Sequence, residues 1–137
     1  MKIEFLEDGS DDCPLIRVYG TDPAEFSSFH GTAQHLAQME SGSSLLQELT
    51  GFRGVSGCTL TLLSGARDIG VSRIGTSLNF EWTLTSGKWL LVAGLIEPFL
   101  IMRREGAHQW LCGREARYGL DIGGIAILIV NSRSGIW

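Results

Sequence analysis

The sequence contains no long uninterrupted hydrophobic run, and this absence excludes a membrane-spanning helix. Its longest apolar stretch, residues 89–102, is interrupted by Glu97 and Pro98, whereas a bilayer-spanning helix needs about 20 consecutive apolar residues. The first residues turn acidic where a secretory signal has its apolar segment, so we expect no signal peptide. The sequence therefore predicts a protein that has no membrane partner.

Cysteine is scarce, and its three positions do not suggest a crosslinked or metal-bound protein. Cys13, Cys58 and Cys112 are odd in number and widely spaced, unlike the paired cysteines of small secreted domains. The sequence has no Cys-x-x-Cys pair and no His-x-x-x-His pair, which are spacings typical of zinc sites. We expect reduced thiols, a cytoplasmic location, no metal and no other cofactor.

The chain also lacks an excess of basic residues, which argues against a nucleic-acid partner. Its formal net charge is −4. Residues 1–48 hold nine acidic residues against Lys2 and Arg17, and residues 49–137 hold nine basic residues against six acidic ones. Nucleic-acid binding depends on a basic face that displaces counterions. We interpret the uneven charge as two solvated faces of opposite sign.

What the sequence does contain is enough apolar material for one folded domain. Of its 137 residues, 44% are hydrophobic and 19% are charged, as in ordinary globular proteins. A chain of this length buries roughly two-thirds of its unfolded surface without needing a metal or a disulfide. No internal repeat and no linker divides the chain, so we predict a single α+β domain over residues 1–137.

The clearest local pattern runs through residues 77–85. Phe80, Trp82 and Leu84 alternate with the polar residues Glu81 and Thr83. A period of two is typical of a strand with one buried face, because successive side chains point to opposite sides. This strand is predicted to organise the core of the protein.

Further strands complete a predicted sheet that is mainly antiparallel. Short connections between three alternating segments predict an antiparallel meander over residues 58–85. The six apolar residues at 125–130 predict a central strand that is covered on both faces. Shorter strands are predicted near residues 2–6 and 15–19, and residues 109–112 favour one more.

Two helices are predicted to cover this sheet. Asp22 and Pro23 form a helix start, and the apolar residues that follow at helical spacing predict a helix over about residues 23–40. A second helix is predicted over about residues 87–97, with a continuous buried strand as the alternative. Residues 45–49 suit either one helical turn or a short strand.

The reactive side chains gather in residues 97–117. Glu97 lies in an apolar run, where burial would raise its pKa and prepare a general acid. In the alternative interpretation it points outward or pairs with Arg103 or Arg104. His108 and Cys112 form a base and thiol pair only if they share a helix, because four residues of a strand span about 13 Å. On the strand that we favour, Cys112 is inert.

Four arginines in the same segment suggest an anion site. Arg103, Arg104, Arg114 and Arg117 would bracket a carboxylate or a phosphate if the loop folds back on itself. The alternative is a solvated, charged loop.

These patterns lead to a ranked set of functional hypotheses. The first is a small cytosolic interaction or binding protein without catalytic activity, whose partner is another protein or a second copy of itself. The alternative is a small enzyme that acts on an anionic substrate through residues 97–117. A third hypothesis is a structural subunit of a homo-oligomer. A pocket that gathers Glu97 and two of the arginines would favour the enzyme.

Overall fold

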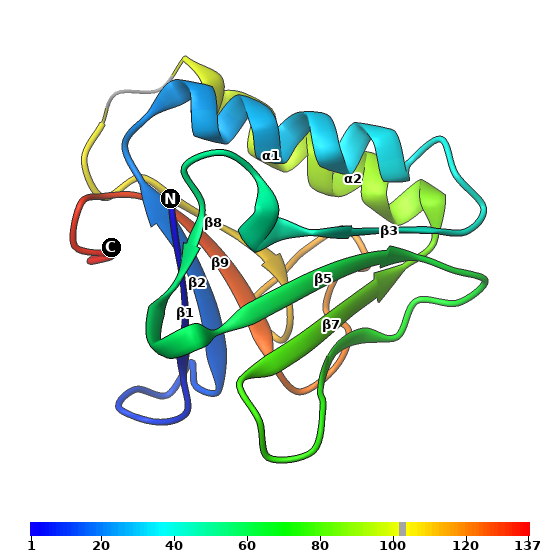
Figure 1. The fold of residues 1–137 in the computed structure, drawn as a ribbon, viewed down its shortest axis with the longest axis horizontal. Coiled ribbons are helices and arrows are strands. Elements are labelled where there is room, and N and C mark those ends of the chain that lie inside the picture. Colours follow the sequence, from blue (N-terminus) through cyan, green and yellow to red (C-terminus); the bar gives the residue numbers. More distant parts are fainter. Residues whose placement is uncertain (102–103) are drawn as a thin grey trace.

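The computed structural model describes residues 1–101 and 104–137, which form an α+β fold of two mixed sheets and two α-helices (Figure 1). The helices are α1 (Pro23–Leu36) and α2 (Ser86–Ile96), and three short 3₁₀ turns are η1 (Leu46–Glu48), η2 (Val55–Gly57) and η3 (Glu97–Leu100). The strands are β1 (Lys2–Leu6), β2 (Leu15–Gly20), β3 (Gly42–Leu45), β4 (Arg53–Gly54), β5 (Thr59–Ser64), β6 (Gly70–Arg73), β7 (Asn79–Leu84), β8 (His108–Cys112) and β9 (Ala126–Asn131).

The larger sheet has five strands in the order β4-β1-β2-β9-β8. β1 and β2 are antiparallel, β2 and β9 are parallel, and β8 returns antiparallel to β9. β9 therefore lies inside the sheet, and all six of its residues are buried. This confirms the central position predicted from the run of apolar residues at 125–130.

The smaller sheet corrects the predicted topology. Its order is β3-β5-β7-β6, with β5 and β7 parallel, so the antiparallel meander over residues 58–85 is wrong. The connection between β5 and β6 crosses the end of β7, where Gly65 N donates to Leu84 O at 3.0 Å and Ile69 N to Thr83 O at 3.0 Å. Strands separated by one neighbour are about 10 Å apart, a distance that this short connection spans. Both sheets are mixed, and the prediction of a mainly antiparallel sheet is wrong.

The alternating segment in β7 forms the centre of the core. Phe80, Trp82 and Leu84 are fully buried, whereas Glu81 is only half-buried. The Trp82 ring lies 4.7 Å from the ring of Trp89, which joins β7 to α2. The predicted apolar face of this strand is thus the surface on which the second helix packs.

Aspartate side chains accept hydrogen bonds at the start of both helices. Asp22 Oδ1 accepts from Ala24 N at 2.9 Å at the start of α1, which satisfies an otherwise unpaired donor. At the start of α2, Asp68 Oδ1 accepts from Thr85 N at 2.8 Å and from Thr85 Oγ1 at 2.9 Å. The α1 helix ends at Leu36, before the predicted end near residue 40, because turn-type bonds replace the helical ones there, such as Met39 N to Leu36 O at 3.2 Å.

Two segments that the sequence left open are now resolved. Residues 86–96 form the helix α2 rather than a buried strand. In the segment 45–49, Leu45 is the last residue of the strand β3, and Leu46–Glu48 form the 3₁₀ turn η1. None of the helices in the two described ranges combines the length and apolar character that crossing a bilayer requires.

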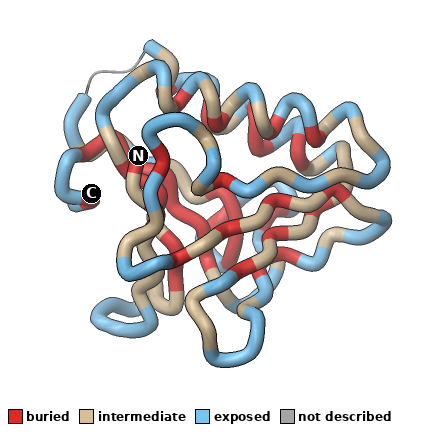
Figure 2. The backbone as a smooth tube through the Cα atoms, in the orientation of Figure 1, coloured by how far each residue is buried: buried red, intermediate tan, exposed pale blue. Residues whose placement is uncertain are grey.

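The two helices lie side by side on one side of both sheets (Figure 1). Figure 2 shows the buried backbone gathered in the strands and on the inward sides of the helices. One apolar cluster contains residues from both helices and both sheets. The accessible surface therefore consists of the outward sides of the helices, the outer edges of the sheets and the connecting loops.

Arg73, at the end of β6, lies where the two sheets meet. The ring of Phe5 on β1 lies 4.7 Å from the ring of Phe80 on β7. The Arg73 guanidinium lies 5.0 Å from the Phe5 ring and 5.8 Å from the Phe80 ring. It also donates from Nε to the Ser77 carbonyl at 2.7 Å, so one side chain supports the ring pair and the turn before β7.

We expect Arg73→Ala to lower the free energy of unfolding by about 1–3 kcal/mol, because it removes cation–π contacts and hydrogen bonds to backbone carbonyls. Urea denaturation measures this loss. Arg73→Lys should lose less, because it keeps the charge near the rings but not the planar fork that binds the turn. A loss below about 0.5 kcal/mol for the alanine variant would contradict the proposed role of this junction.

Candidate functional site

The last strand of the larger sheet provides an accessible edge. β8 pairs with β9 on one side, and no strand in the described ranges pairs with its other side. The register between β8 and β9 shifts between Trp110 and Cys112, which marks a bulge at the end of the strand. Edge strands present unpaired backbone N–H and C=O groups and are frequent sites of pairing with another chain.

A hollow of about 410 Å³ lies along this edge. His108, Gln109 and Trp110 are successive residues of β8, and all three line it. Neighbouring side chains on a strand point to opposite faces, so only the edge of β8 brings all three residues to one space. The remaining lining residues are Leu95 of α2 and Glu115, Arg117 and Tyr118 of the loop after β8. We call this space the β8 hollow.

A contact between α2 and the loop after β8 helps to shape the β8 hollow. Lys88 Nζ donates to the Tyr118 carbonyl at 3.4 Å. Tyr118 itself has a φ of 60°, a backbone region that residues other than glycine adopt uncommonly. Its side chain is 66% exposed. Such strained positions often occur at ligand-binding surfaces, and here the strain accompanies an aromatic ring held in solvent.

The β8 hollow carries one acidic and one basic side chain, and only the acidic one has an ion-pair partner among the described residues. Its two formally charged lining residues are Glu115 and Arg117. Glu115 Oε1 lies 3.7 Å from Arg114 Nε, so its charge already has a partner. The Arg117 guanidinium is exposed and has no ion pair or hydrogen bond with the described residues. Anionic groups are therefore favoured at this end of the hollow.

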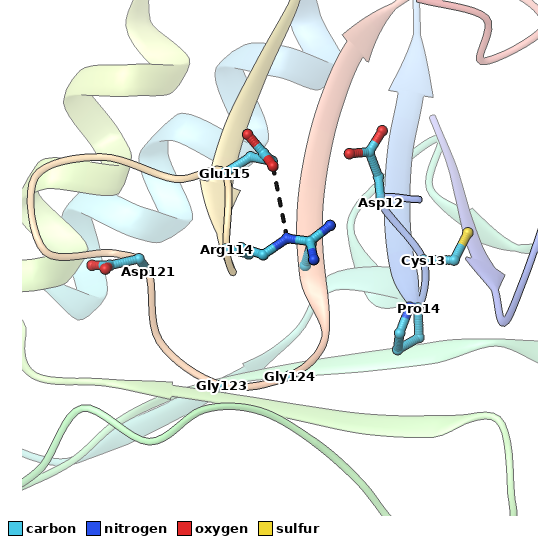
Figure 3. Close-up of a pocket in the computed structure, with 9 residues that line it drawn as sticks. Asp12, Cys13, Pro14, Arg114, Glu115, Asp121, Gly123 and Gly124 are labelled. Carbon is cyan, nitrogen blue, oxygen red and sulfur yellow. Dashed lines mark ion pairs between the residues drawn. The ribbon is translucent and has the colours of Figure 1, made fainter. Parts of the chain in front are cut away.

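A second hollow, of about 480 Å³, lies on the other side of the same loop (Figure 3). Figure 3 shows Arg114, Glu115 and Asp121 on one segment and Asp12 on the segment before β2. Three of these four side chains are acidic. Arg114 Nη2 donates to the backbone carbonyl of Asp11 at 2.6 Å, so this arginine links the two segments.

These carboxylates do not assemble into a metal site. Within residues 1–101 and 104–137, no group of three or more His, Cys, Asp or Glu side chains is placed to hold a metal ion. The second hollow is thus an acidic, solvated surface, with its arginine occupied by a structural contact. The β8 hollow has the more varied chemistry.

The structure separates the predicted catalytic candidates. Glu97 is exposed at the start of η3 and lines neither hollow. His108 is exposed at the start of β8, with Nδ1 3.1 Å from the Gly106 carbonyl oxygen, and it lines the β8 hollow. Cys112 is fully buried at the other end of the strand. The three groups share no common space.

Cys112 lies in an environment that disfavours its thiolate. Burial raises the pKa of this thiol to about 11, although backbone groups and the Trp82 indole N–H partly oppose the shift. Trp82 Nε1 is buried without a hydrogen-bond partner of good geometry, so its contact with the sulfur is weak. The thiol donates to the Ile122 carbonyl at 3.3 Å. At neutral pH it remains protonated and out of contact with solvent.

The predicted arginines also fall at different places. Arg103 lies outside the described residues. Arg104 is exposed and lines neither hollow, and its carbonyl accepts a hydrogen bond from Asn131 Nδ2 at 3.1 Å. Arg114 lines the second hollow and Arg117 lines the β8 hollow. The two arginines of the loop therefore face different spaces instead of bracketing one ligand.

Sequence reasoning missed most of the apolar lining of the β8 hollow. Tyr118 lies one residue beyond the segment that was singled out, and Leu95 comes from α2. Trp110 was in that segment but was given no role. The available signal was the clustering of Trp, Tyr and Arg, which are the residue types most enriched at binding hot spots.

Comparisons of this chain with models of protein families, with curated proteins and with solved structures find no match in any of the three. The function proposed for this chain therefore depends on the residues that line the β8 hollow.

Proposed function

We propose that this chain is a non-catalytic binding protein and that another protein docks on the β8 hollow. The observation that carries this proposal is the Arg117 guanidinium, which has no ion pair with the described residues and which lines, with Tyr118 and Leu95, a concave space at a sheet edge. Arginine and aromatic side chains contribute most of the binding energy in many protein interfaces. A hollow lined in this way supports binding without requiring any reactive group.

The placement of the reactive groups supports binding over catalysis. An enzyme that acts on an anionic substrate needs a nucleophile or a proton-transfer group beside the anion site. Cys112 is buried with a raised pKa, and Glu97 is exposed outside the hollow. His108 is the one member of the predicted set that lies near Arg117 in the β8 hollow. The enzyme is therefore the weaker alternative.

The proposal includes a cytoplasmic location and excludes nucleic acid as the partner. All three cysteines are free in this fold, as expected of a protein in a reducing compartment. Of the residues that line the β8 hollow, one is an arginine and one a glutamate, whereas nucleic-acid binding generally uses a broad basic surface.

A retention experiment with matched variants tests the binding role. We expect immobilised wild-type protein to retain a partner that Arg117→Glu and Tyr118→Ser lose by about tenfold or more, because both substitutions act on a binding hot spot. Arg67→Glu makes the same charge change at an exposed turn away from the hollow, and it should retain the partner fully.

Light scattering on the same variants tests whether the partner is a second copy of the chain. An association that depends on Arg117 and Tyr118 would support this surface as the binding site. If the wild type retains nothing and stays monomeric, or if all variants behave alike, the proposed function is wrong.

A further inference from the structure

We propose that the segment bound by the β8 hollow is an extended acidic peptide, which pairs as an added strand with the outer edge of β8. This inference rests on the proposed function and specifies its partner. It has three parts: the free backbone edge, the apolar lining and the unpaired Arg117. Each part constrains a different feature of the bound segment.

The backbone of β8 is able to accept another strand. It is the outermost strand of its sheet, and in an antiparallel ladder alternate residues turn their N–H and C=O groups away from the paired neighbour. The Trp110 carbonyl accepts a hydrogen bond from the side chain of its neighbour, Gln109 Nε2, at 3.2 Å. A side-chain amide thus occupies a carbonyl to which an added strand would donate a backbone N–H. Strand addition is a common mode of peptide recognition.

The lining of the hollow determines what the peptide side chains meet. Leu95 of α2 and Tyr118 of the loop after β8 supply apolar and aromatic lining. The Trp110 ring instead lies 6.5 Å from the ring of Trp137 and packs on Tyr19, Leu128 and Val130. Side chains of an added strand alternate between its two faces, so every second residue of the peptide would face this lining. Aliphatic residues at alternate positions suit these contacts.

Charge complementarity selects an acidic residue among those side chains. The Arg117 guanidinium has no ionic partner in the described residues, whereas Glu115 is next to Arg114. A planar guanidinium binds a carboxylate through two parallel hydrogen bonds. A lysine in the same peptide position would be repelled instead, so the hollow discriminates by the sign of the charge.

A second copy of the chain is a poorer occupant of this edge. Edge-to-edge pairing of two β8 strands would bring an Arg117 guanidinium to each side of the interface. Like charges oppose such pairing. An acidic segment of a different protein removes this conflict.

Defined peptides test this inference on the full chain labelled with ¹⁵N. The first probe is a capped heptapeptide that alternates valine and threonine around a central glutamate. The second has lysine at the centre. We expect the glutamate peptide to shift the amide resonances of residues 108–111 and 118 and to bind about five- to tenfold more tightly, because an exposed ion pair replaces a repulsion.

Backbone methylation separates strand pairing from side-chain binding. N-methylation of alternate amides in the glutamate peptide removes either the donors that face β8 or the donors that face away. We expect one methylated register to abolish binding and the other to preserve it, since only one set of donors pairs with an edge. Equal effects of the two registers would reject the added strand.

Charge reversal provides the matched control. Arg117→Glu should reverse the preference toward the lysine peptide, and Arg67→Glu should leave it unchanged. The inference is overturned if no peptide shifts the β8 resonances, if both charges bind equally, or if the shifts reflect dimerisation through β8. When the peptides fail but immobilised protein still retains a partner that depends on Arg117, only the added strand is rejected. When the retention experiment fails as well, the proposed function is also wrong.

Discussion

Replacing Trp82 by alanine is expected to lower the free energy of unfolding by about 3–5 kcal/mol. The indole is fully buried on β7, and its ring packs 4.7 Å from the ring of Trp89 on α2. The substitution leaves a cavity between the smaller sheet and a helix, which surrounding side chains fill only in part. Because a domain of this kind has a net stability of about 5–15 kcal/mol, chemical denaturation should show a large shift of the midpoint.

Two further substitutions in β7 make this expectation specific. Glu81→Ala changes the next residue along the strand, which is half-buried on the opposite face, and should cost about 0.5 kcal/mol or less. Trp82→Phe should cost less than Trp82→Ala, because it keeps a ring and removes an indole N–H that has no good partner. Equal losses for Trp82→Ala and Glu81→Ala would show that this face of β7 does not organise the core.

The second large effect is expected at alkaline pH, where the fold should lose about 2–3 kcal/mol for each of two buried thiols. Burial raises the pKa of Cys58 and of Cys112 from 9.0 to about 11. The thiols of the unfolded chain therefore ionise first. Their contribution to stability is fully present below pH 9 and is lost progressively as the pH rises to 11. Urea denaturation at a series of pH values measures the loss.

Single cysteine variants separate this effect from other alkaline titrations. Between pH 9 and 11, Cys112→Ala should remove about half of the part of the pH dependence of the unfolding free energy that comes from the thiols. This holds whatever the substitution does to stability at neutral pH. Tyr19 is a second source of alkaline pH dependence, because burial raises its pKa above the ordinary value of 10.0 and the nearby Glu4 adds to the shift. An unchanged slope in Cys112→Ala would show that its thiol is not buried.

Local sequence patterns correctly predicted which strands have a buried face and where the first helix begins. The alternation around Phe80 and Trp82 identified a strand and its buried face, and the apolar run before Asn131 identified a strand inside its sheet. Asp22 was predicted as a helix cap, and its carboxylate accepts a backbone hydrogen bond at the start of α1. Each of these features is decided by residues close together in the chain.

The order of the strands was not available from such patterns. A period of two reports the face of a strand but not its neighbours, so β7 was expected beside β6 alone, in a simple meander. In the structure β7 lies between β5 and β6 and pairs parallel with β5. The short strands β3 and β4 were also missed, since their few residues carry no recognisable alternation.

The candidate site shows the same division. The sequence by itself determined which reactive and aromatic side chains are present after residue 97, and that β8 would hold His108 and Cys112 too far apart to act together. Only the tertiary structure decided that Arg114 and Arg117 line different hollows, and that Leu95 from α2 joins Tyr118 beside β8. The physical reason is that apolar periodicity reflects burial within one element, whereas a binding surface depends on how separate elements pack and which sheet edge is left unpaired.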